Sequence, residues 1–442
     1  MAAPEASATS PVAPDKHFPA REAIERTQLR KLGTLIHAIL PANAFYAGKL
    51  GNDLRGWSPA NLAEFSQRIP FTTKHELIRD RLEHPPYGTG LTFPLGSYVR
   101  CHQTSGTTTM PIRWLDTPES WAHIVDNWVA ILGAAGVTRQ DRFFFAFSFG
   151  PFIGFWSALE AVNKLGCFCF PGGAMSSPAR LQAIIDNHIT AVCCTPTYAQ
   201  HLGEVARERR IDLSRGNVRL LIVAGEAGGS IPATRARIER LWPGARVFDH
   251  HGMTEVGPVT YQCPAQPGVL HVLESAYLAE VINPETGAAA APGETGELVL
   301  TTLDRTGSPL LRYRTGDLVK LRKPSPCACG RHELALQGGI IGRSDDMLIV
   351  RGVNVYPSLI EEIVRTAEVS EYRVRMDGNT AMRELVIDIE PASDCPNPTA
   401  LQQRLELSLQ SALNLRIPVR LLLPGTLPRF EMKAQRWIRS AA

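Results

Sequence analysis

The chain has 442 residues, of which 44% are hydrophobic and 20% are charged, and its formal net charge at pH 7 is +3. A chain of this length exceeds one ordinary hydrophobic core, so we expect two or more domains. The near-balanced charge gives no indication of nucleic-acid binding, and no apolar run reaches the ~18 residues that a membrane span needs. We therefore expect a globular protein with no nucleic-acid or membrane partner.

The N-terminal segment 1–19 is rich in Ala, Pro and Ser and lacks the basic and apolar regions of a secretory signal. We expect a disordered tail here and a cytoplasmic location. The nine cysteines agree with that location, because an odd number without a signal peptide is typical of a reducing compartment.

Apolar residues at helical spacing begin at residue 21 and predict a helical start that ends at Pro41. Apolar and amphipathic segments then alternate from residue 141 to residue 252. Strands are expected at 141–147, 167–170, 191–196, 218–225 and 245–252, and helices at 152–166, 178–188, 198–210 and 231–242. This alternation predicts a mostly parallel sheet with helices on both faces.

The pattern becomes strand-rich after residue 252, which predicts a β-rich subdomain. The last part of the chain predicts a small α+β domain, with helices at 358–367 and 399–413 and strands at 371–377, 384–390 and 418–423. We therefore predict an α/β protein. Its large N-terminal domain, which includes the β-rich subdomain, covers 20–341, a hinge covers 342–346, and a mobile C-terminal lid domain covers 347–442.

The segment Thr104–Trp114 carries a run of hydroxyl side chains beside one glycine, after a predicted strand at 97–103. It is not a P-loop, since the Gly-Lys-Ser/Thr ending is absent. Hydroxyls and the amides of a tight glycine turn can hold phosphate oxygens. A polar turn explains the same residues equally well, so the segment alone leaves both interpretations open.

Four later segments carry polar side chains suited to a nucleotide site. Asp249–Pro258 contains Glu255, which is either a Mg²⁺ ligand or a solvated residue at a helix start. In Tyr313–Asp317 the aspartate suits a turn or the two hydroxyls of a ribose. Gly342–Pro357 lies at the expected domain boundary, and a basic segment near the C-terminus contains Lys433, which alone would be an ordinary surface lysine.

The order of these five segments resembles that of the adenylate-forming superfamily of acyl-CoA synthetases, adenylation domains and luciferases. The closest resemblance is to the phenylacetate–CoA ligase family, whose N-terminal signature is similar to Phe71–Leu77. The resemblance covers residues 20 to 440. It implies that ATP activates a carboxylic acid to an acyl-adenylate with release of pyrophosphate, and that coenzyme A then accepts the acyl group.

The resemblance also implies a nucleotide site. The residues expected to hold the β- and γ-phosphates of ATP are Ser105, Gly106, Thr107 and Thr108. The residues expected around adenine and ribose are Gly225, Glu226, His251, Gly252, Asp317 and Arg343. Within this second group, Asp317 would hold the ribose hydroxyls with help from Arg343, and His251 stands where relatives often have tyrosine.

Four further residues acquire roles from the same resemblance. Thr254 would touch the α-phosphate and Glu255 would bind Mg²⁺. Lys433 would bridge the acid carboxylate and the α-phosphate during adenylation. Asp345 lies where relatives hinge, so that the C-terminal domain rotates between the two half-reactions.

The phosphate segment departs from the family at two positions. Where the family usually continues Gly-Lys-Pro, this chain has Thr109, Met110 and Pro111. The missing lysine removes one positive charge near the pyrophosphate, and the missing glycine stiffens the turn. We expect weaker ATP binding with activity retained, because backbone amides and hydroxyls make most of the contacts.

A second set of residues suits a structural Zn²⁺ ion, as some relatives carry at this place. The ligand types are those of a Cys₃His site: Cys263, His271, Cys327 and Cys329. His332 is an alternative fourth ligand. Ordinary reduced cysteines are the competing interpretation, since the more specific Cys-x-x-Cys spacing is absent.

The segment 143–156 is unusually aromatic and lies where the family builds its acid-binding pocket. About half of these rings are expected in the core. The candidates for a flat apolar cavity are Phe147, Phe149, Phe152 and Trp156. Such a cavity suits an aromatic acid.

Three functions remain to be weighed. The first is an aryl- or arylacetyl-CoA ligase, and the second is a stand-alone adenylating enzyme that passes the acyl group to a carrier protein or an amine. The third is a catalytically lapsed nucleotide-binding relative, against which the presence of Glu255, Asp317, Arg343 and Lys433 argues. A homodimer is common among relatives, although the sequence itself does not indicate one.

Overall fold

The computed structural model describes residues 18–51, 54, 56–104, 111–323, 326–344, 348–351, 353–377, 384–430 and 434–439. Six of the predicted site residues lie outside the described residues: Ser105, Gly106, Thr107, Thr108, Asp345 and Lys433. Residues 109 and 110 and most of the predicted tail also lie outside them. In the part of the chain that the structure covers, no helix is both long and apolar enough to span a bilayer.

The chain begins with four helices: α1 (Arg21–Ile39), α2 (Ala44–Leu50), α3 (Leu62–Arg68) and α4 (Lys74–Glu83). The first of them ends just before Pro41, as predicted. Its apolar face packs against the β-rich part of the chain through Leu278, Leu303 and Leu311. A capping box formed by Thr73 and Glu76 begins α4, inside the segment that resembles the family's N-terminal signature.

A five-stranded parallel sheet forms the centre of the molecule, as the alternating pattern predicts. Its strand order is β4-β3-β5-β6-β7. The strands are β3 (Arg142–Phe145), β4 (Phe168–Pro171), β5 (Ala191–Cys194), β6 (Leu220–Val223) and β7 (Arg246–Asp249). The flanking helices are α5 (Pro118–Ala134), α6 (Ile153–Lys164), α7 (Ser177–Asp186), α8 (Pro196–Glu208) and α9 (Pro232–Leu241).

Alternate residues of these strands enter two separate hydrophobic clusters. Phe143 and Phe145 of β3 lie in one cluster, whereas Phe144 between them lies in the other. Side chains of a strand alternate between its two faces, so both faces of the sheet are covered. This burial explains why the strands are continuously apolar.

The β-rich part is a six-stranded antiparallel sheet with the order β10-β11-β15-β14-β13-β12. Its strands are β10 (Thr260–Gln262), β11 (Val269–Val272), β12 (Tyr277–Ile282), β13 (Thr295–Thr302), β14 (Tyr313–Leu321) and β15 (Ala335–Arg343). Two small hairpins precede it, one of β1 (Arg100–Gln103) and β2 (Arg113–Asp116), the other of β8 (Gly252–Met253) and β9 (Gly257–Pro258).

Two local interpretations of the sequence change here. Asp317 does not end a turn but lies within β14, next to a register shift between β14 and β15. Glu255 is at the tip of the β8–β9 hairpin and not at a helix start. In both cases the polar and glycine-containing sequence allowed a turn or helix start, while strand pairing decided the structure.

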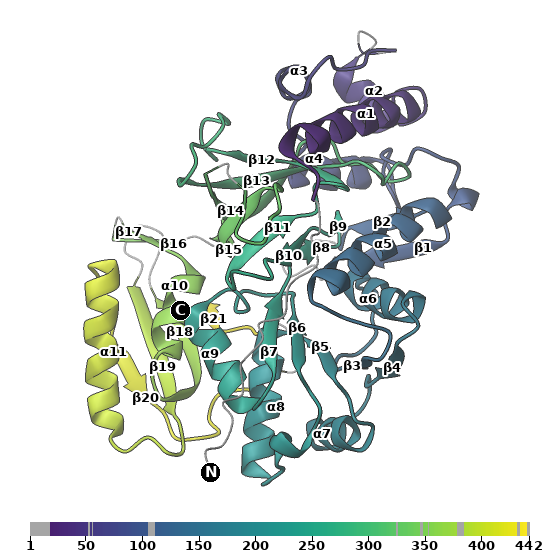
Figure 1. Ribbon diagram of the computed structural model, residues 1–442. Helices are drawn as coiled ribbons and strands as arrows, with labels where there is room; N and C mark the ends of the chain where they lie inside the picture. The colour runs from purple at the N-terminus through teal and green to yellow at the C-terminus, as the bar shows by residue number, and fades with distance from the viewer. Residues whose placement is uncertain are drawn as a thin grey trace, which may run out of the picture.

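The C-terminal α+β domain has a hydrophobic cluster of its own and lies beside α9 (Figure 1). Its helices are α10 (Pro357–Arg365) and α11 (Pro398–Leu413). Its strands are β16 (Leu348–Val350), β17 (Val353–Val355), β18 (Val369–Asp377), β19 (Glu384–Pro391), β20 (Val419–Leu421) and β21 (Trp437–Arg439).

The four-stranded sheet of this domain has the order β20-β19-β18-β21. The predicted last strand at 418–423 corresponds to β20, but β21 follows it and pairs parallel with β18. Three residues within a basic segment carry no strand pattern, so the sequence did not reveal β21. The extra strand returns the chain to the interface with the N-terminal domain.

Candidate active site

The candidate site lies beyond the carboxyl ends of the parallel strands. Gly225 and Glu226 follow β6, His251 follows β7, and Phe147 follows β3. In open α/β sheets ligands bind at these ends, where loops from neighbouring strands converge. Residues that are far apart in the sequence are therefore brought to one edge of the sheet.

Asp317 is held between two basic side chains. Nε2 of His251 lies 2.8 Å from Oδ2 of Asp317, and Nη1 of Arg343 lies 3.0 Å from Oδ1. The carboxylate is only 3% exposed, and such burial is costly for a charge without hydrogen-bonded partners. The arrangement links the loop after β7 to β14 and β15, and it unites three of the predicted ribose and adenine residues.

Gly316 allows this arrangement. Its φ angle is +77°, and a Cβ atom built on it would come within 3.0 Å of Nη2 of Arg343. A larger residue would therefore strain the backbone and displace the guanidinium that binds Asp317.

The β8–β9 hairpin carries Thr254 and Glu255 and is fixed by a buried ion pair. Nη1 of Arg305 donates hydrogen bonds to the backbone carbonyls of Glu255 at 2.7 Å and Thr254 at 3.2 Å. The same guanidinium binds Asp116 through two bonds of 2.6 and 2.7 Å. Both charged residues are buried, so the hairpin is positioned by a paired charge away from water.

Sequence reasoning missed Arg305 and Asp116. An isolated arginine and an isolated aspartate 189 positions apart form no local pattern. No signal in a single sequence could have identified the pair, because only the tertiary structure brings Asp116 at the end of β2 beside Arg305 in the loop after β13.

The carboxylate of Glu255 fits a bound cation. The residue is 8% exposed, and within the described residues its carboxylate has no hydrogen-bond or ion-pair partner. Burial lowers the pKa of Arg81 to about 10, an effect opposed by the charges of Asp80 and Glu255. Burial and the charge of Glu255 raise the pKa of the Tyr313 hydroxyl. A largely buried carboxylate without a protein partner is the kind of oxygen ligand that Mg²⁺ uses.

Three of the predicted acid-pocket rings form a contiguous group. The ring of Phe149 lies 5.6 Å from that of Phe147 and 5.0 Å from that of Trp156, measured between centroids. Phe147 also belongs to the core, whereas Trp156 is 39% exposed. The group therefore runs from the core to the surface. Phe152 begins α6 as its N-cap residue and is half-buried.

The four predicted zinc ligands lie together. The sulfur atoms of Cys263 and Cys327 are 3.5 Å apart, and the sulfur of Cys329 is 3.4 Å from Nε2 of His271. All four potential ligand atoms lie within 4.8 Å of one another, and His332 is not part of the group. Burial lowers the pKa of His271 to about 4, so its ring is neutral at pH 7, as metal ligation requires.

Glu226 and Gly252 occupy positions that the sequence did not anticipate in detail. Glu226 accepts hydrogen bonds from the backbone N–H groups of Thr197 and Ala434, and so touches the C-terminal domain. Gly252 opens β8, where an added Cβ would come within 2.8 Å of the carbonyl oxygen of Gly257. The tight hairpin that holds Thr254 and Glu255 therefore depends on that glycine.

Known protein families match most of the chain. The AMP-binding enzyme family matches residues 103–303, and the AMP-binding enzyme C-terminal domain matches residues 352–440. The phenylacetate–coenzyme A ligase of Thermus thermophilus is 30% identical over 430 residues, which are 92% of this chain and 94% of the relative. The chain belongs to the phenylacetate–CoA ligase family of adenylate-forming enzymes. The Escherichia coli phenylacetate–coenzyme A ligase is 32% identical over 87% of this chain and 88% of its own length.

A solved structure of another ligase has the same fold and matches nearly the whole of this chain. The postadenylation state of 2-hydroxyisobutyryl-CoA ligase with 2-HIB-AMP has 27% identity and a TM-score of 0.89, over 98% of this chain and 95% of that one. The same ligase in its thioesterification state gives a TM-score of only 0.71 over the same shares. Both comparisons are with the same ligase, in two different states. The difference in TM-score therefore reflects how the domains of that ligase are arranged relative to one another.

We predict that Arg305→Met lowers the free energy of unfolding by about 3–5 kcal/mol, because it leaves the carboxylate of Asp116 buried without a partner. Arg207→Met, which removes the exposed pair with Asp394, is the control and should cost less than about 1 kcal/mol. Chemical denaturation of the full chain measures both. Equal effects of the two substitutions would contradict the role given to the buried pair.

Proposed function

We propose that this ligase activates an aromatic carboxylic acid with ATP and transfers the acyl group to coenzyme A. The observation that carries the proposal is the grouping of Glu255, Asp317 and Arg343 around Tyr313, in a chain whose relatives are phenylacetate–CoA ligases. In the first step, an oxygen of the acid attacks the α-phosphorus of ATP, and pyrophosphate leaves. In the second, the thiol sulfur of CoA attacks the acyl carbon, and AMP and a proton leave.

Different side chains are proposed to bind different parts of ATP. Asp317 supplies two acceptor oxygens for the ribose hydroxyls, and Arg343 holds the carboxylate in place. His251 reaches the other carboxylate oxygen of Asp317 and presents a flat ring to the adenine. We assign Gly225 and Gly252 to the adenine side of the same site. The roles of Ser105, Gly106, Thr107 and Thr108 as phosphate donors are part of the same proposal.

Charge compensation in the first step comes from three groups. Thr254 contacts the α-phosphate, and the positive charge of Lys433 stabilises charge that develops between the carboxylate and the phosphorus. Glu255 would hold Mg²⁺, which supplies Lewis-acid stabilisation of the phosphate oxygens when bound. We further propose that residues 342–346, including Asp345, form the hinge between domains 20–341 and 347–442.

The aromatic group formed by Phe147, Phe149 and Trp156 supports an aromatic acid. Edge-on and tilted rings with centroids separated by 5.0 to 5.6 Å present apolar surface beside the end of β3. We place Phe152 at the same wall, since it begins α6 directly after this segment. An acid with an aliphatic chain would leave part of these ring faces without contact.

A structural Zn²⁺ ion is part of the proposal. Tetrahedral zinc with Zn–S bonds of about 2.3 Å separates two sulfur ligands by about 3.8 Å. The observed 3.5 Å between Cys263 and Cys327 is close to that separation. Four protein ligands leave no open position, so the ion would tie β11 to the segment before β15 and take no part in catalysis.

The test of the proposed reaction is a screen for pyrophosphate release across aromatic acids, with and without CoA. We expect acid-dependent release by the wild-type chain and an acyl-CoA product when CoA is present. Lys433→Ala should abolish acid-dependent release while ATP binding stays nearly intact. Normal release by that variant would contradict the assignment, and an acyl product only with a carrier protein or an amine would replace CoA as the acceptor.

Elemental analysis of the purified chain tests the metal site. We expect about one zinc per chain, and Cys327→Ser should lower that content because it removes one of four ligands. Cys101→Ser, at an exposed cysteine outside the group, should retain the zinc. A wild-type chain without zinc after purification in zinc-containing medium would contradict the site.

A further inference from the structure

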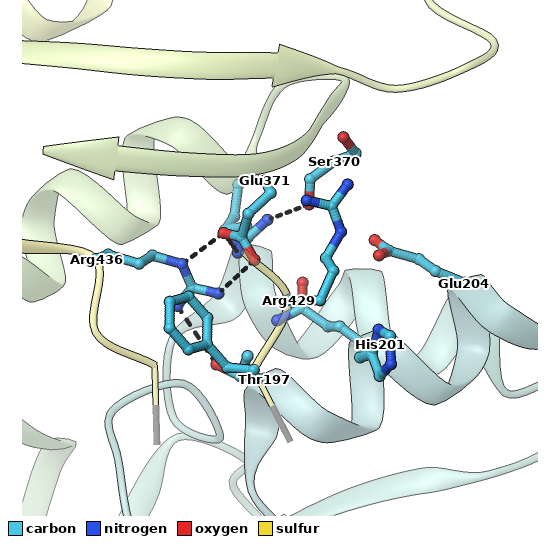
Figure 2. A pocket seen from close by; sticks show the side chains of 10 residues that line it. Thr197, His201, Glu204, Ser370, Glu371, Arg429 and Arg436 are labelled. Atoms are coloured by element: carbon cyan, nitrogen blue, oxygen red, sulfur yellow. Dashed lines mark hydrogen bonds and ion pairs between the residues drawn. The ribbon is translucent and has the colours of Figure 1, made fainter. Parts of the chain in front are cut away.

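Polar side chains fill the interface between the C-terminal domain and helix α8. Figure 2 shows Thr197, His201 and Glu204 facing Glu371 and Arg436 of the C-terminal domain. Arg436 is 7% exposed and binds Glu371 through bonds of 2.7 and 3.2 Å. Burial disfavours the charge of Glu371, but Arg436 and Arg365 outweigh it and lower the pKa of that carboxyl. The C-terminal segment around Arg436 is therefore fixed in its own domain by paired charges.

Glu226 connects the two domains through a single carboxylate. Its Oε1 accepts a hydrogen bond of 2.9 Å from the backbone N–H of Thr197, at the start of α8. Its Oε2 accepts one of 2.8 Å from the backbone N–H of Ala434. Ala434 directly follows Lys433 in the sequence. The carboxylate therefore fixes the backbone beside the proposed catalytic lysine.

Other contacts support the same docking. Nη1 of Arg436 lies 3.4 Å from the hydroxyl of Thr197, the residue whose amide binds Glu226. Arg237 of α9 pairs with Glu204 at 2.6 Å and also donates to the backbone carbonyl of Val369, where β18 begins. These bonds all cross, or support, the boundary between α8–α9 and the C-terminal domain.

The arrangement of the two domains resembles that of the solved relative in its postadenylation state. The much higher TM-score against the postadenylation state than against the thioesterification state shows that the two domains sit here as in the former. A different placement of the C-terminal domain would separate Ala434 and Arg436 from Glu226 and Thr197. The contacts of Glu226 therefore belong to one of the two arrangements.

We propose that Glu226 is a positioning residue for adenylation: by binding the N–H of Ala434 it docks the segment that follows Lys433 against α8, and it releases that segment for thioester formation. The proposal rests on the role given above to Lys433. A carboxylate acceptor suits the task, because a charge-assisted hydrogen bond is strong when formed and is replaced by water when the domain leaves. Glu226 thus acts through the lysine and need not touch the nucleotide.

Glu226→Gln tests this role with little change of shape. The amide oxygen of glutamine can still accept from Thr197, but its NH₂ group cannot accept from Ala434. Two assays separate the half-reactions: acid-dependent pyrophosphate release, and thioester formation from CoA and the synthetic adenylate of whichever acid, benzoic or phenylacetic, the wild-type chain activates. We expect kcat for pyrophosphate release to fall about tenfold or more. The KM for ATP and the rate of thioester formation should stay within about twofold.

Thr195→Ala is the matched control. Thr195 caps the same helix by accepting a hydrogen bond from the N–H of Tyr198, and it has no bond to the C-terminal domain among the described residues. Its loss should lower stability while both half-reactions keep their relative rates. Glu226→Asp, which keeps the charge but shortens the side chain, should recover part of the adenylation rate.

Three results would overturn the proposal. The first is a rise in the KM for ATP with unchanged kcat, which would place Glu226 in the adenine pocket. The second is an equal loss in both half-reactions, and the third is no loss in either. Failure of the proposed function would look different, since the wild-type chain would then release no pyrophosphate with any acid tested.

Discussion

The buried carboxylate of Asp317 joins the parts of the molecule that must act together. His251 reaches it from the loop after the parallel sheet, and Arg343 reaches it from the last strand of the antiparallel sheet. Asp317 is only 3% exposed, and a charge buried to this extent is stable only when it is paired. Its two ion pairs therefore hold the two sheets together at this point. Because Arg343 lies within the proposed hinge 342–346, the same contact also anchors the start of that hinge.

The two halves of the reaction make opposite demands on the interface between the domains. In the proposed mechanism, adenylation needs the cation of Lys433 beside the carboxylate and the α-phosphate, whereas thioester formation needs that cation withdrawn and the acceptor admitted. On the N-terminal side the site is held rigidly for adenylation, because Arg305 binds the backbone of the hairpin that carries Glu255. The hydrogen bonds of Glu226 allow the later change for thioester formation, because they are strong enough to dock the C-terminal domain and few enough to break.

The fold followed from the sequence where burial left a periodic pattern. The continuous apolar strands predicted the parallel sheet because both of its faces are covered, and the Cys₃His residue types predicted a group that the structure brings within 4.8 Å. The pair of Arg305 and Asp116 left no such pattern, nor did the bond from Glu226 to Ala434. Each joins residues far apart in the chain through one contact, which only the tertiary structure determines.

Isotope transfer distinguishes an adenylate route from its alternatives. The acid labelled with ¹⁸O in both carboxylate oxygens is incubated with ATP, CoA and the wild-type chain, and the products are analysed by mass spectrometry. If a carboxylate oxygen attacks the α-phosphorus, one ¹⁸O atom must appear in AMP for each acyl-CoA formed. AMP without label, or ADP as the nucleotide product, would contradict the adenylate mechanism for this enzyme.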